Sequence, residues 1–580
     1  MSLLDKASLI ITPNAYKESK LYSVIPSNGD GDMTVVRATT ATRVNEAGLI
    51  EVVPKNLLTY SEEFDNASWV KDGVSLTTNA TISPNGTTTA DLITESATLG
   101  SHRVYKIISI FGNGSFSFFV KSNGVQWIAI AAGNTSSFGV YSFFDIINGT
   151  LGVSTIGTSK IEDYGNGWYR CSVNGIGNGG GTSGNIYLAE SNGVNSYTGN
   201  GVDGIYIWGA QLEAGSTATS YFPTTDRLNI PRIDYTGGGC PSILVEPQRT
   251  NLLLQSEDIS SASWTKNAVS ITANNTTSPD GTTNADLITA DGTNTQHYVL
   301  QGQASSAKTI SFFVKMGTQR YVQILTGGSA NALANYDLQT GEVGGLGSAS
   351  TGSMVDYGNS WWRIVLTSSD AVTSSVYLCF VNSLIQGRFP STTSTGTIWI
   401  WGAMAENGAT YPTSYIPTVA SSVTRNADVI SKTGISDLIN SEEGVLYAEI
   451  ATLVNTLTVD NSITLTDGGN NKLIFRYRST NSFNVKVFVN GVSQAEANHT
   501  LSNSTNFNKI AIKWKLNDYE IYVNGISIFT DTNALVFPNN SINTLSFSDG
   551  LSTPFYGKVQ NLMVFPSALS DTELIALTTL

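Results

Sequence analysis

Two stretches of this chain repeat the same ordered set of motifs, and that duplication restricts the fold more than any other feature. NLLTYSEEF (56–64) returns as NLLLQSEDI (251–259), SPNGTTTADLIT (83–94) as SPDGTTNADLIT (278–289), and IYIWGAQLEAG (205–215) as IWIWGAMAENG (398–408). The offset is 195 between Trp69 and Trp264, 193 between the IWGA motifs, and falls to 190 near Tyr187 and Tyr377. Because the offset changes between motifs, insertions lie in loops. The chain must therefore build one module twice.

Within each copy, apolar and polar residues alternate with the period of a β-strand. Phe116, Phe118 and Val120 share one face of an expected strand, and Ile310, Phe312 and Val314 repeat the arrangement. Asn-Gly and Gly-Asn turns separate many such short runs. Only 13% of residues are charged and 55 are glycine, a composition that suits turns and strands better than long helices. We expect an all-β protein with two tandem jelly-roll β-sandwiches.

Length, charge and cysteine content exclude several classes of protein. A chain of 580 residues suggests about three or four domains. A formal net charge of −14 argues against nucleic-acid partners, which need clustered Lys and Arg. Cys171, Cys240 and Cys379 cannot form a closed disulfide framework, and we expect Cys171 and Cys379 to be buried thiols. The sequence predicts no signal peptide, no transmembrane segment and no membrane insertion.

Short stretches that begin with an arginine separate the modules. Arg43, Arg227 and Arg425 open them, and the first two lead into LIEVVPKNLL and ILVEPQRTNLL. A connector repeated in this way predicts modules docked in a fixed relation, not joined by a loose Gly/Ser tether. The expected organisation is an N-terminal attachment segment (1–50), repeat 1 (51–225), a connector (226–250), repeat 2 (251–420), a second connector (421–434) and a C-terminal module (435–580).

The C-terminal module has its own pattern. KIAIKWKLNDYEIYVNGISI (509–528) alternates strictly around Asn-Asp and Asn-Gly turns, and the chain closes on a strand followed by SALSDTELIALT (567–578). Ser570 and Glu573 have the spacing of a capping box at the start of a short helix. These residues resemble the laminin G / concanavalin A-like sandwiches, which implies a third β-sandwich here.

The repeats resemble carbohydrate-binding-module-type jelly rolls of bacteriophage structural proteins. SEEFDNASWVK, SPNGTTTADLI, GNGWYR, IWGAQLEAG and ATSYFPTT carry the resemblance, together with ILVEPQRTNLLLQSE. The opening MSLLDKASLIITPNAYKESK resembles the start of phage tail- or head-fibre proteins. The resemblance implies a virion-surface fibre, on tail or capsid, that binds host cell-surface glycan and contacts other virion proteins through the N-terminal segment. By analogy with fibres we expect a homo-oligomer, a trimer.

Two alternatives to an adhesin remain open: a surface decoration protein without a receptor role, and a polysaccharide-degrading fibre. Glycosidases need paired carboxylates, and no Glu-x-Asp-x-x-Glu string occurs. Several acids recur between the copies, and we interpret them as structural: Glu51/Glu246, Glu62/Glu257, Asp91/Asp286, Asp163/Asp356 and Glu213/Glu406. We therefore expect no enzyme, no catalytic residue, no metal-ligating residue and no cofactor, with a structural Ca²⁺ the one open exception. We expect His102 and His297 to be satisfied core or rim side chains.

Aromatic side chains are the candidates for sugar contact. Three pairs of tryptophans occupy matching strand motifs, and we expect them in the cores: Trp69/Trp264, Trp168/Trp361 and Trp208/Trp401. Trp127 and Tyr321 match each other beside the loops SNGVQ and GTQR, and are the predicted glycan-binding residues. Trp362 and Trp399 replace Tyr169 and Tyr206, on a face that either binds a ligand or meets another domain.

Overall fold

The computed structural model describes most of the chain and is built almost entirely of strands. Among the described residues the only α-helix is α1 (Asp571–Thr578), beside two 3-10 turns, η1 (Leu4–Lys6) and η2 (Ser436–Leu438). No described helix has the length and apolarity to cross a membrane. Pro54, Lys55, Asp226 and Arg227 of the predicted junctions lie outside the described residues. The described residues are 3–17, 19–53, 56–108, 114–134, 141–155, 157–176, 182–214, 218, 221–225, 229–302, 307–327, 332–348, 350–372, 375–455, 460–549 and 553–579.

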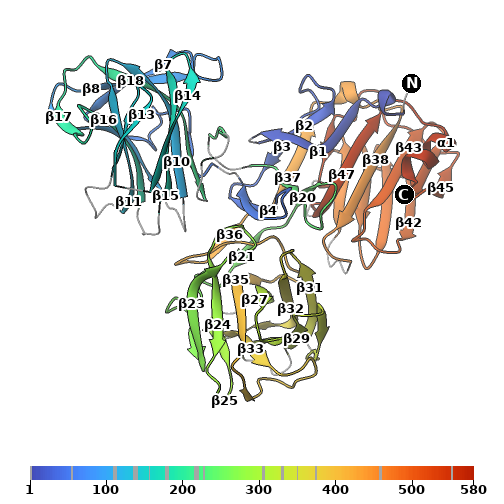
Figure 1. Ribbon diagram of the computed structural model, residues 1–580. Helices are drawn as coiled ribbons and strands as arrows, with labels where there is room; N and C mark the ends of the chain where they lie inside the picture. Colours follow the sequence, from blue (N-terminus) through green and yellow to red (C-terminus); the bar gives the residue numbers. More distant parts are fainter. Residues whose placement is uncertain are drawn as a thin grey trace. The chain divides into compact units, whose positions relative to one another are not determined.

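Repeat 1 is a sandwich of two antiparallel sheets, as predicted (Figure 1). The first sheet has the order β14 (Thr158–Gly165), β15 (Trp168–Ile176), β10 (Gly114–Asn123), β18 (Gly204–Ala214), β8 (Ala90–Glu95), β7 (Val74–Thr81). The second has the order β13 (Thr150–Ser154), β12 (Ser142–Asp145), β11 (Trp127–Asn134), β16 (Thr182–Ala189), β9 (Leu99–Ile108), β17 (Ser196–Thr198), with β6 (Val70–Asp72) also on β9.

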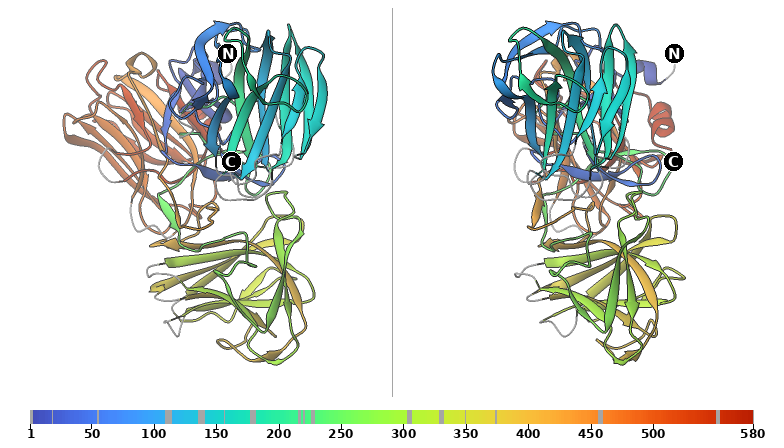
Figure 2. Two further views of the ribbon diagram at one scale, coloured as in Figure 1. Left: turned by 90° about the vertical axis from the view of Figure 1, so that its left-hand side faces the viewer. Right: turned by 60° about the vertical axis from the view of Figure 1, so that its left-hand side comes forward.

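Repeat 2 builds the same two layers (Figure 2). Its first sheet has the order β23 (Val269–Thr276), β24 (Ala285–Ala290), β35 (Thr397–Asn407), β27 (Ala307–Met316), β32 (Trp361–Val372), β31 (Ser350–Asp356), extended by β21 (Arg249–Asn251) and β36 (Val423–Arg425). Its second has the order β22 (Thr265–Asn267), β26 (Tyr298–Gly302), β33 (Ser375–Val381), β28 (Tyr321–Thr326), β29 (Leu333–Asp337), β30 (Glu342–Gly344). β25 (Asn294–Thr295) pairs with β34 (Thr392–Thr393).

The strand register corrects one detail of the duplication. Trp127 lies opposite Ala189, and its counterpart Tyr321 lies opposite Val381. Ala189 and Val381 are therefore equivalent, which sets the offset of these strands at 192 instead of 190. Tyr187 consequently corresponds to Cys379 and not to Tyr377. The shared tyrosine had suggested the wrong register, and a slip of two residues keeps each side chain on the same face of the sheet.

All six matching tryptophans are buried. Trp69 and Trp264 lie in the cores between the sheets, as predicted. The other four pack outside those cores, Trp168 and Trp208 in a cluster with Phe119, and Trp361 and Trp401 in a cluster with Phe313. The backbone conformation explains the glycine of the repeated IWGA motif. Gly402 has φ +62° at a register shift between β27 and β35, and a Cβ there would lie 2.7 Å from the Phe313 ring. Gly209 repeats this φ, so each copy needs glycine at its β-bulge.

The C-terminal module is a third sandwich, and N-terminal strands complete it. Figure 1 shows the N-terminal strands, in blue, beside β47 (Gly557–Phe565) and β37 (Val429–Thr433). One continuous strand path runs through both of its layers and through this segment, with β19 (Ile233–Asp234) and β20 (Ser242–Val245) attached to β47. Its order is β42 (Val492–Thr500), β41 (Ser482–Val489), β40 (Lys472–Tyr477), β39 (Asn461–Thr466), β46 (Thr544–Ser546), β37 (Val429–Thr433), β3 (Met33–Val36), β2 (Lys20–Ile25), β1 (Leu9–Lys17), β47 (Gly557–Phe565), β38 (Glu443–Thr452), β43 (Asn508–Lys515), β44 (Tyr519–Val523), β45 (Ile526–Asp531).

Strands β1, β2 and β3 of the N-terminal segment are thus part of this sandwich. Leu9, Ile11, Leu21 and Met33 are at most 1% exposed in the same core as the C-terminal strands. Sequence reading missed this pairing because partners more than 500 residues apart leave no local pattern. Whether these residues attach the chain to anything stays a prediction.

Contacts divide the chain into two compact units: residues 53–228, and residues 1–52 together with 229–580. The first unit is repeat 1, and the second contains repeat 2 and the C-terminal sandwich.

Helix α1 packs on β43 and β44, and Ser570 donates its backbone N–H to the Glu573 carboxylate at 3.0 Å, as the predicted capping box requires.

Candidate binding faces of the two repeats

The second sheet of repeat 1 turns one face to the core and a different set of side chains outward. Along β11, Ile128 and Ile130 enter the core, whereas Trp127 and Ala129 belong to a separate aromatic cluster outside it. The alternation follows from the period of two along a strand. We call this outward surface face 1. Its apolar cluster consists of Trp127, Ala129, Ala131, Tyr141, Phe143, Tyr187 and Ala189.

Arg103 is the charged centre of face 1. Its guanidinium carbon lies 4.7 Å from the centroid of the Tyr105 ring and 5.4 Å from that of Tyr187. One nitrogen donates to the Tyr187 hydroxyl at 2.7 Å, and Nε donates to Asp72 at 3.0 Å. Burial lowers the pKa of Arg103, but Tyr187 and Asp72 outweigh it and raise the pKa, so the guanidinium stays charged. With 23% of the side chain exposed, it is fixed in place and still reachable from solvent.

The amide of Asn185 adds a polar group beside Arg103. It donates to the Ala131 carbonyl at 3.1 Å, and its oxygen accepts from Arg103 at 3.3 Å. Tyr105, Trp127 and Tyr141 are half-buried, so part of each ring remains accessible. Face 1 therefore combines aromatic rings, a held guanidinium and a held amide.

The two predicted glycan-binding residues occupy equivalent places. Trp127 begins β11 opposite Asp145, and Tyr321 begins β28 opposite Asp337. Both side chains are half-buried. Tyr321 lies next to Arg320, whose guanidinium carbon is 4.9 Å from the ring centroid. The structure brings Trp127 into the Arg103 surface and places Tyr321 at the matching point of repeat 2, but their role in binding stays a prediction.

Face 2, the equivalent outward surface of repeat 2, has a different composition. Strand pairing places Gln323 where repeat 1 has Ala129, Asn335 where it has Phe143, and Tyr298 where it has Arg103. Tyr298, Tyr377 and Phe389 surround the buried Cys379. Amides and tyrosines thus replace the guanidinium of face 1.

Sequence reading missed Arg103, Asn185 and Tyr187. Arg103 sits in RVYKI, which reads as an ordinary strand, and nothing in the chain order connects it with 185–187. A signal was nevertheless present, because an arginine flanked by apolar alternation must either reach solvent or find partners. Comparing the two copies at their correct register would have flagged it, since repeat 2 has tyrosine there.

The acids that recur between the copies accept hydrogen bonds that hold the fold, as Asp91 and Asp286 show. Asp91 accepts backbone N–H groups of Phe64 and Asn79 at 3.1 and 3.0 Å, and Asp286 repeats this with Ile259 and Asn274. His102 and His297 are buried and hydrogen-bonded, as expected. Within the described ranges no group of three or more His, Cys, Asp or Glu side chains is placed to hold a metal ion.

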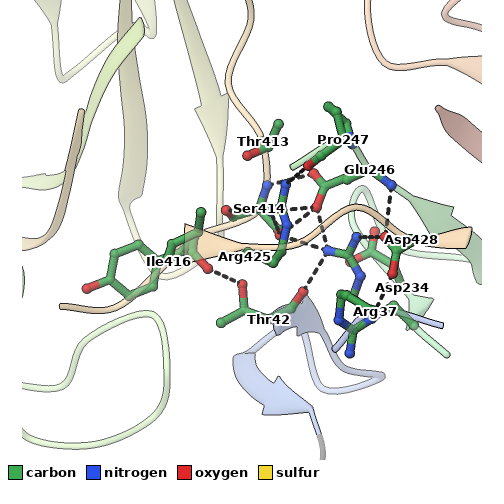
Figure 3. A network of polar contacts seen from close by, with 12 residues as sticks. Arg37, Thr42, Asp234, Glu246, Pro247, Thr413, Ser414, Ile416, Arg425 and Asp428 are labelled. Atoms are coloured by element: carbon green, nitrogen blue, oxygen red, sulfur yellow. Dashed lines mark hydrogen bonds and ion pairs between the residues drawn. The ribbon is translucent and has the colours of Figure 1, made fainter. Parts of the chain in front are cut away.

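A buried ion network joins the N-terminal segment to both connectors (Figure 3). Asp428 pairs with Arg37 at 2.7 Å and with Arg232, and Glu246 pairs with Arg425 at 2.9 Å and with Arg232. Burial raises the pKa of both carboxyls, but the arginines outweigh it and hold each pKa below its ordinary value. This network holds the N-terminal segment and the two connectors together within one compact unit.

Comparisons with known proteins identify the third sandwich. Residues 450–575 match the family model of the concanavalin A-like lectin/glucanases superfamily. The chain contains a concanavalin A-like domain. A search of the curated proteins finds no match.

Solved structures resemble parts of the chain. The CBM40 of the Ruminococcus gnavus IT-sialidase, bound to α2,3-sialyllactose, is 20% identical over 24% of this chain and 83% of its own, with a TM-score of 0.21. Domain 4 of AbnA, an extracellular arabinanase of Geobacillus stearothermophilus, in complex with arabinotriose, is 12% identical over 30% and 83%, with a TM-score of 0.22. Domains LG4-5 of mouse laminin α1 are 10% identical over 48% and 92%, with a TM-score of 0.18.

Proposed function

We propose that this protein is a non-catalytic virion fibre protein that binds host-surface glycan through face 1 of repeat 1. The observation that carries the proposal is Arg103, held between the rings of Tyr105 and Tyr187 on an outward sheet surface. The virion assignment rests on the resemblance of the repeat motifs and the opening residues to phage fibre proteins.

The chemistry of face 1 suits a sugar ring. Pyranose C–H groups pack against aromatic faces, and sugar hydroxyls bond to planar polar groups in fixed positions. Trp127 and Tyr141 offer half-accessible rings, while Arg103 and Asn185 offer polar groups already held by neighbours. Because these groups are preorganised, little side-chain entropy is lost on binding.

A fibre can turn a weak site into firm attachment. A single site with a millimolar Kd is worth about −4 kcal/mol. Oligomerisation raises the avidity by roughly 10²–10⁴ when the sites can engage together. The predicted trimer would supply that multiplicity.

The binding test compares the full chain with two variants on host cells and on a glycan array. Arg103→Ala should weaken binding by about 10- to 100-fold, since it removes charge-assisted hydrogen bonds. Lys160→Ala, on the exposed Lys160–Glu162 pair of the same repeat, is the matched control and should bind normally. Equal binding by both variants would remove face 1 from the proposal.

Two further measurements test the virion location and the non-catalytic role that we propose. Electron microscopy of particles labelled with antibody against the chain should place it on a fibre. Label on the capsid shell alone, without glycan binding, would favour surface decoration. Host polysaccharide incubated with the protein should release no reducing ends, and their release would contradict the non-catalytic part.

A further inference from the structure

The two repeats differ in the loop that follows the central strand of the second sheet. In repeat 1, residues 190–195 join β16 to β17, and Ser191, Asn192, Gly193 and Val194 are exposed. In repeat 2, the loop from Asn382 to Ser391 is longer, and we call it the covering loop. Both loops begin in the same way: Asn192 lies by Gly152, and Leu384 lies by the equivalent Gly344.

The covering loop then continues across face 2, where side-chain amides hold its backbone. Gln323 donates to the Gly387 carbonyl at 3.1 Å and accepts from the Phe389 N–H at 2.9 Å. Asn335 donates to the carbonyls of Leu384 and Gln386 at 2.9 and 2.8 Å. Gln323 and Asn335 are fully buried, so their amides need hydrogen-bond partners within the protein. The backbone of the covering loop supplies those partners.

One aromatic side chain of the loop sits among the tyrosines of face 2. The Phe389 ring lies 5.1 Å from the Tyr298 ring and 5.2 Å from the Tyr377 ring, between centroids. Phe389 has φ +54°, a left-handed conformation that is rare for a bulky residue. Such strain persists only where the surroundings hold it, so the packing of Phe389 outweighs its backbone cost.

We propose that the covering loop is an internal ligand of face 2, and that repeat 2 carries a closed glycan-binding site. The loop places backbone carbonyls and an N–H against the amides of Gln323 and Asn335, and the Phe389 ring against Tyr298 and Tyr377. On an uncovered face, these amides and tyrosines are the groups that the hydroxyls and C–H faces of a sugar would contact. Face 1 has Ala129 and Phe143 at the positions of those amides, and neither side chain can hold a loop backbone by a hydrogen bond. The proposal rests on the proposed function for its ligand class.

The rates at which the three cysteines react with a thiol reagent show whether the covering loop is in place. Cys379 lies 2% exposed beneath Tyr298 and Phe389, Cys171 is in the core of repeat 1, and Cys240 is exposed. Ellman's reagent should therefore label Cys240 quickly in every variant and leave Cys171 unlabelled. In the wild type Cys379 should also stay unlabelled.

Two variants of the full chain open the cover to different degrees. In one, the sequence Ser191–Asn195 of repeat 1 replaces Asn382–Ser391; in the other, Phe389→Ala removes only the inserted ring. Both should label Cys379 at least about tenfold faster, because local opening controls access to a buried thiol. Ile385→Ala, in the same loop but 87% exposed, is the matched control and should match the wild type. An unlabelled Cys379 in both opened variants would overturn the proposal.

The glycan arm uses immobilised lactose, maltose, cellobiose and chitobiose together with host cells. In an Arg103→Ala background, the loop-replaced chain should regain binding that Arg103→Ala alone has lost. Failure to regain it, with Cys379 freely labelled, would reduce the loop to a structural cover and overturn the closed site. Binding by the loop-replaced chain when the wild type binds nothing would instead refute face 1 and leave the closed site standing.

Discussion

At the scale of single residues, the side chain of Asn251 connects several backbone segments of repeat 2 by hydrogen bonds. Its amide nitrogen donates to the Ala403 and Ile416 carbonyls at 3.1 and 2.8 Å, and its oxygen accepts from Leu253 and Ala405 N–H groups. Asn56 makes the same bonds in repeat 1, to Ala210, Phe222, Leu58 and Leu212. The first letter of the repeated NLL motif is thus fixed by four hydrogen bonds that no other side chain of its size could make.

We predict that Asn251→Ala destabilises repeat 2 by about 2–4 kcal/mol, because it leaves several buried backbone groups unpaired. Asn28→Ala is the control, since Asn28 is exposed and bonds to Asp30 in its own turn. Hydrogen exchange of β35 should quicken in the first variant and not in the second. Equal exchange would mean that water replaces the amide at no cost.

Glu257 gives repeat 2 a pH dependence. Burial, with Asp280 nearby, raises its pKa from an ordinary 4.5 to about 8, although the Tyr415 hydroxyl at 3.2 Å opposes the shift. The folded state then holds a proton that the unfolded state releases, so the free energy of unfolding should fall as pH rises from about 4.5 to about 8. Urea denaturation across that range should show the decline, and Glu257→Gln should flatten it. A stability that rises with pH in the wild type would contradict this pKa.

At the scale of elements, much of the fold was readable from the chain and the binding faces were not. Alternation along 115–121 predicted a strand, and the capping box at Ser570 predicted α1, because each pattern is local. Of the tryptophan pairs, Trp69/Trp264 lie in the cores as predicted, and the other two pairs are buried outside them. The open or covered state of a face depends on a loop elsewhere in the chain. Sequence reasoning chose Trp127 and Tyr321 as a matched pair, yet one shares its surface with Arg103 and the other lies on a face crossed by the covering loop.

Strand β2 provides a test of the N-terminal strands as part of the C-terminal sandwich. Leu21 is 0% exposed in the shared core, whereas Val24 on the same strand is 40% exposed. Leu21→Ala should cost about 2–5 kcal/mol, as buried leucines do, and should speed hydrogen exchange in β47 and β37. Val24→Ala should change stability by no more than about 0.5 kcal/mol. Unchanged exchange in β47 after Leu21→Ala would mean that the sandwich is stable without its N-terminal strands.

At the scale of the whole molecule, the ion network around Asp428 links segments that are far apart in sequence. Asp428→Asn removes the buried counter-charge of Arg37 and one of the two carboxylates that pair with Arg232, and should cost about 3–5 kcal/mol. Glu162→Gln breaks the exposed Lys160–Glu162 pair and should cost less than about 1 kcal/mol. Limited proteolysis should cut 229–250 and 421–434 faster in Asp428→Asn only. Resistance equal to the wild type would show that packing alone holds the connectors.

The pairing of β1 with β47 bears on the attachment role predicted for the N-terminal segment. Because β1 and β47 are neighbours in one sheet, an attachment through residues 1–50 would bring the concanavalin A-like domain to the attachment point.

Pairing between the first and the last strands also has a consequence for synthesis. Leu9 lies opposite Val564, and Ile11 lies opposite Leu562. At about 5–20 residues per second, β1 leaves the ribosome roughly half a minute to two minutes before β47 exists. Repeats 1 and 2 have all their strands long before then and can fold first. An apolar strand that must wait for β47 is exposed to misassembly until its partner is synthesised.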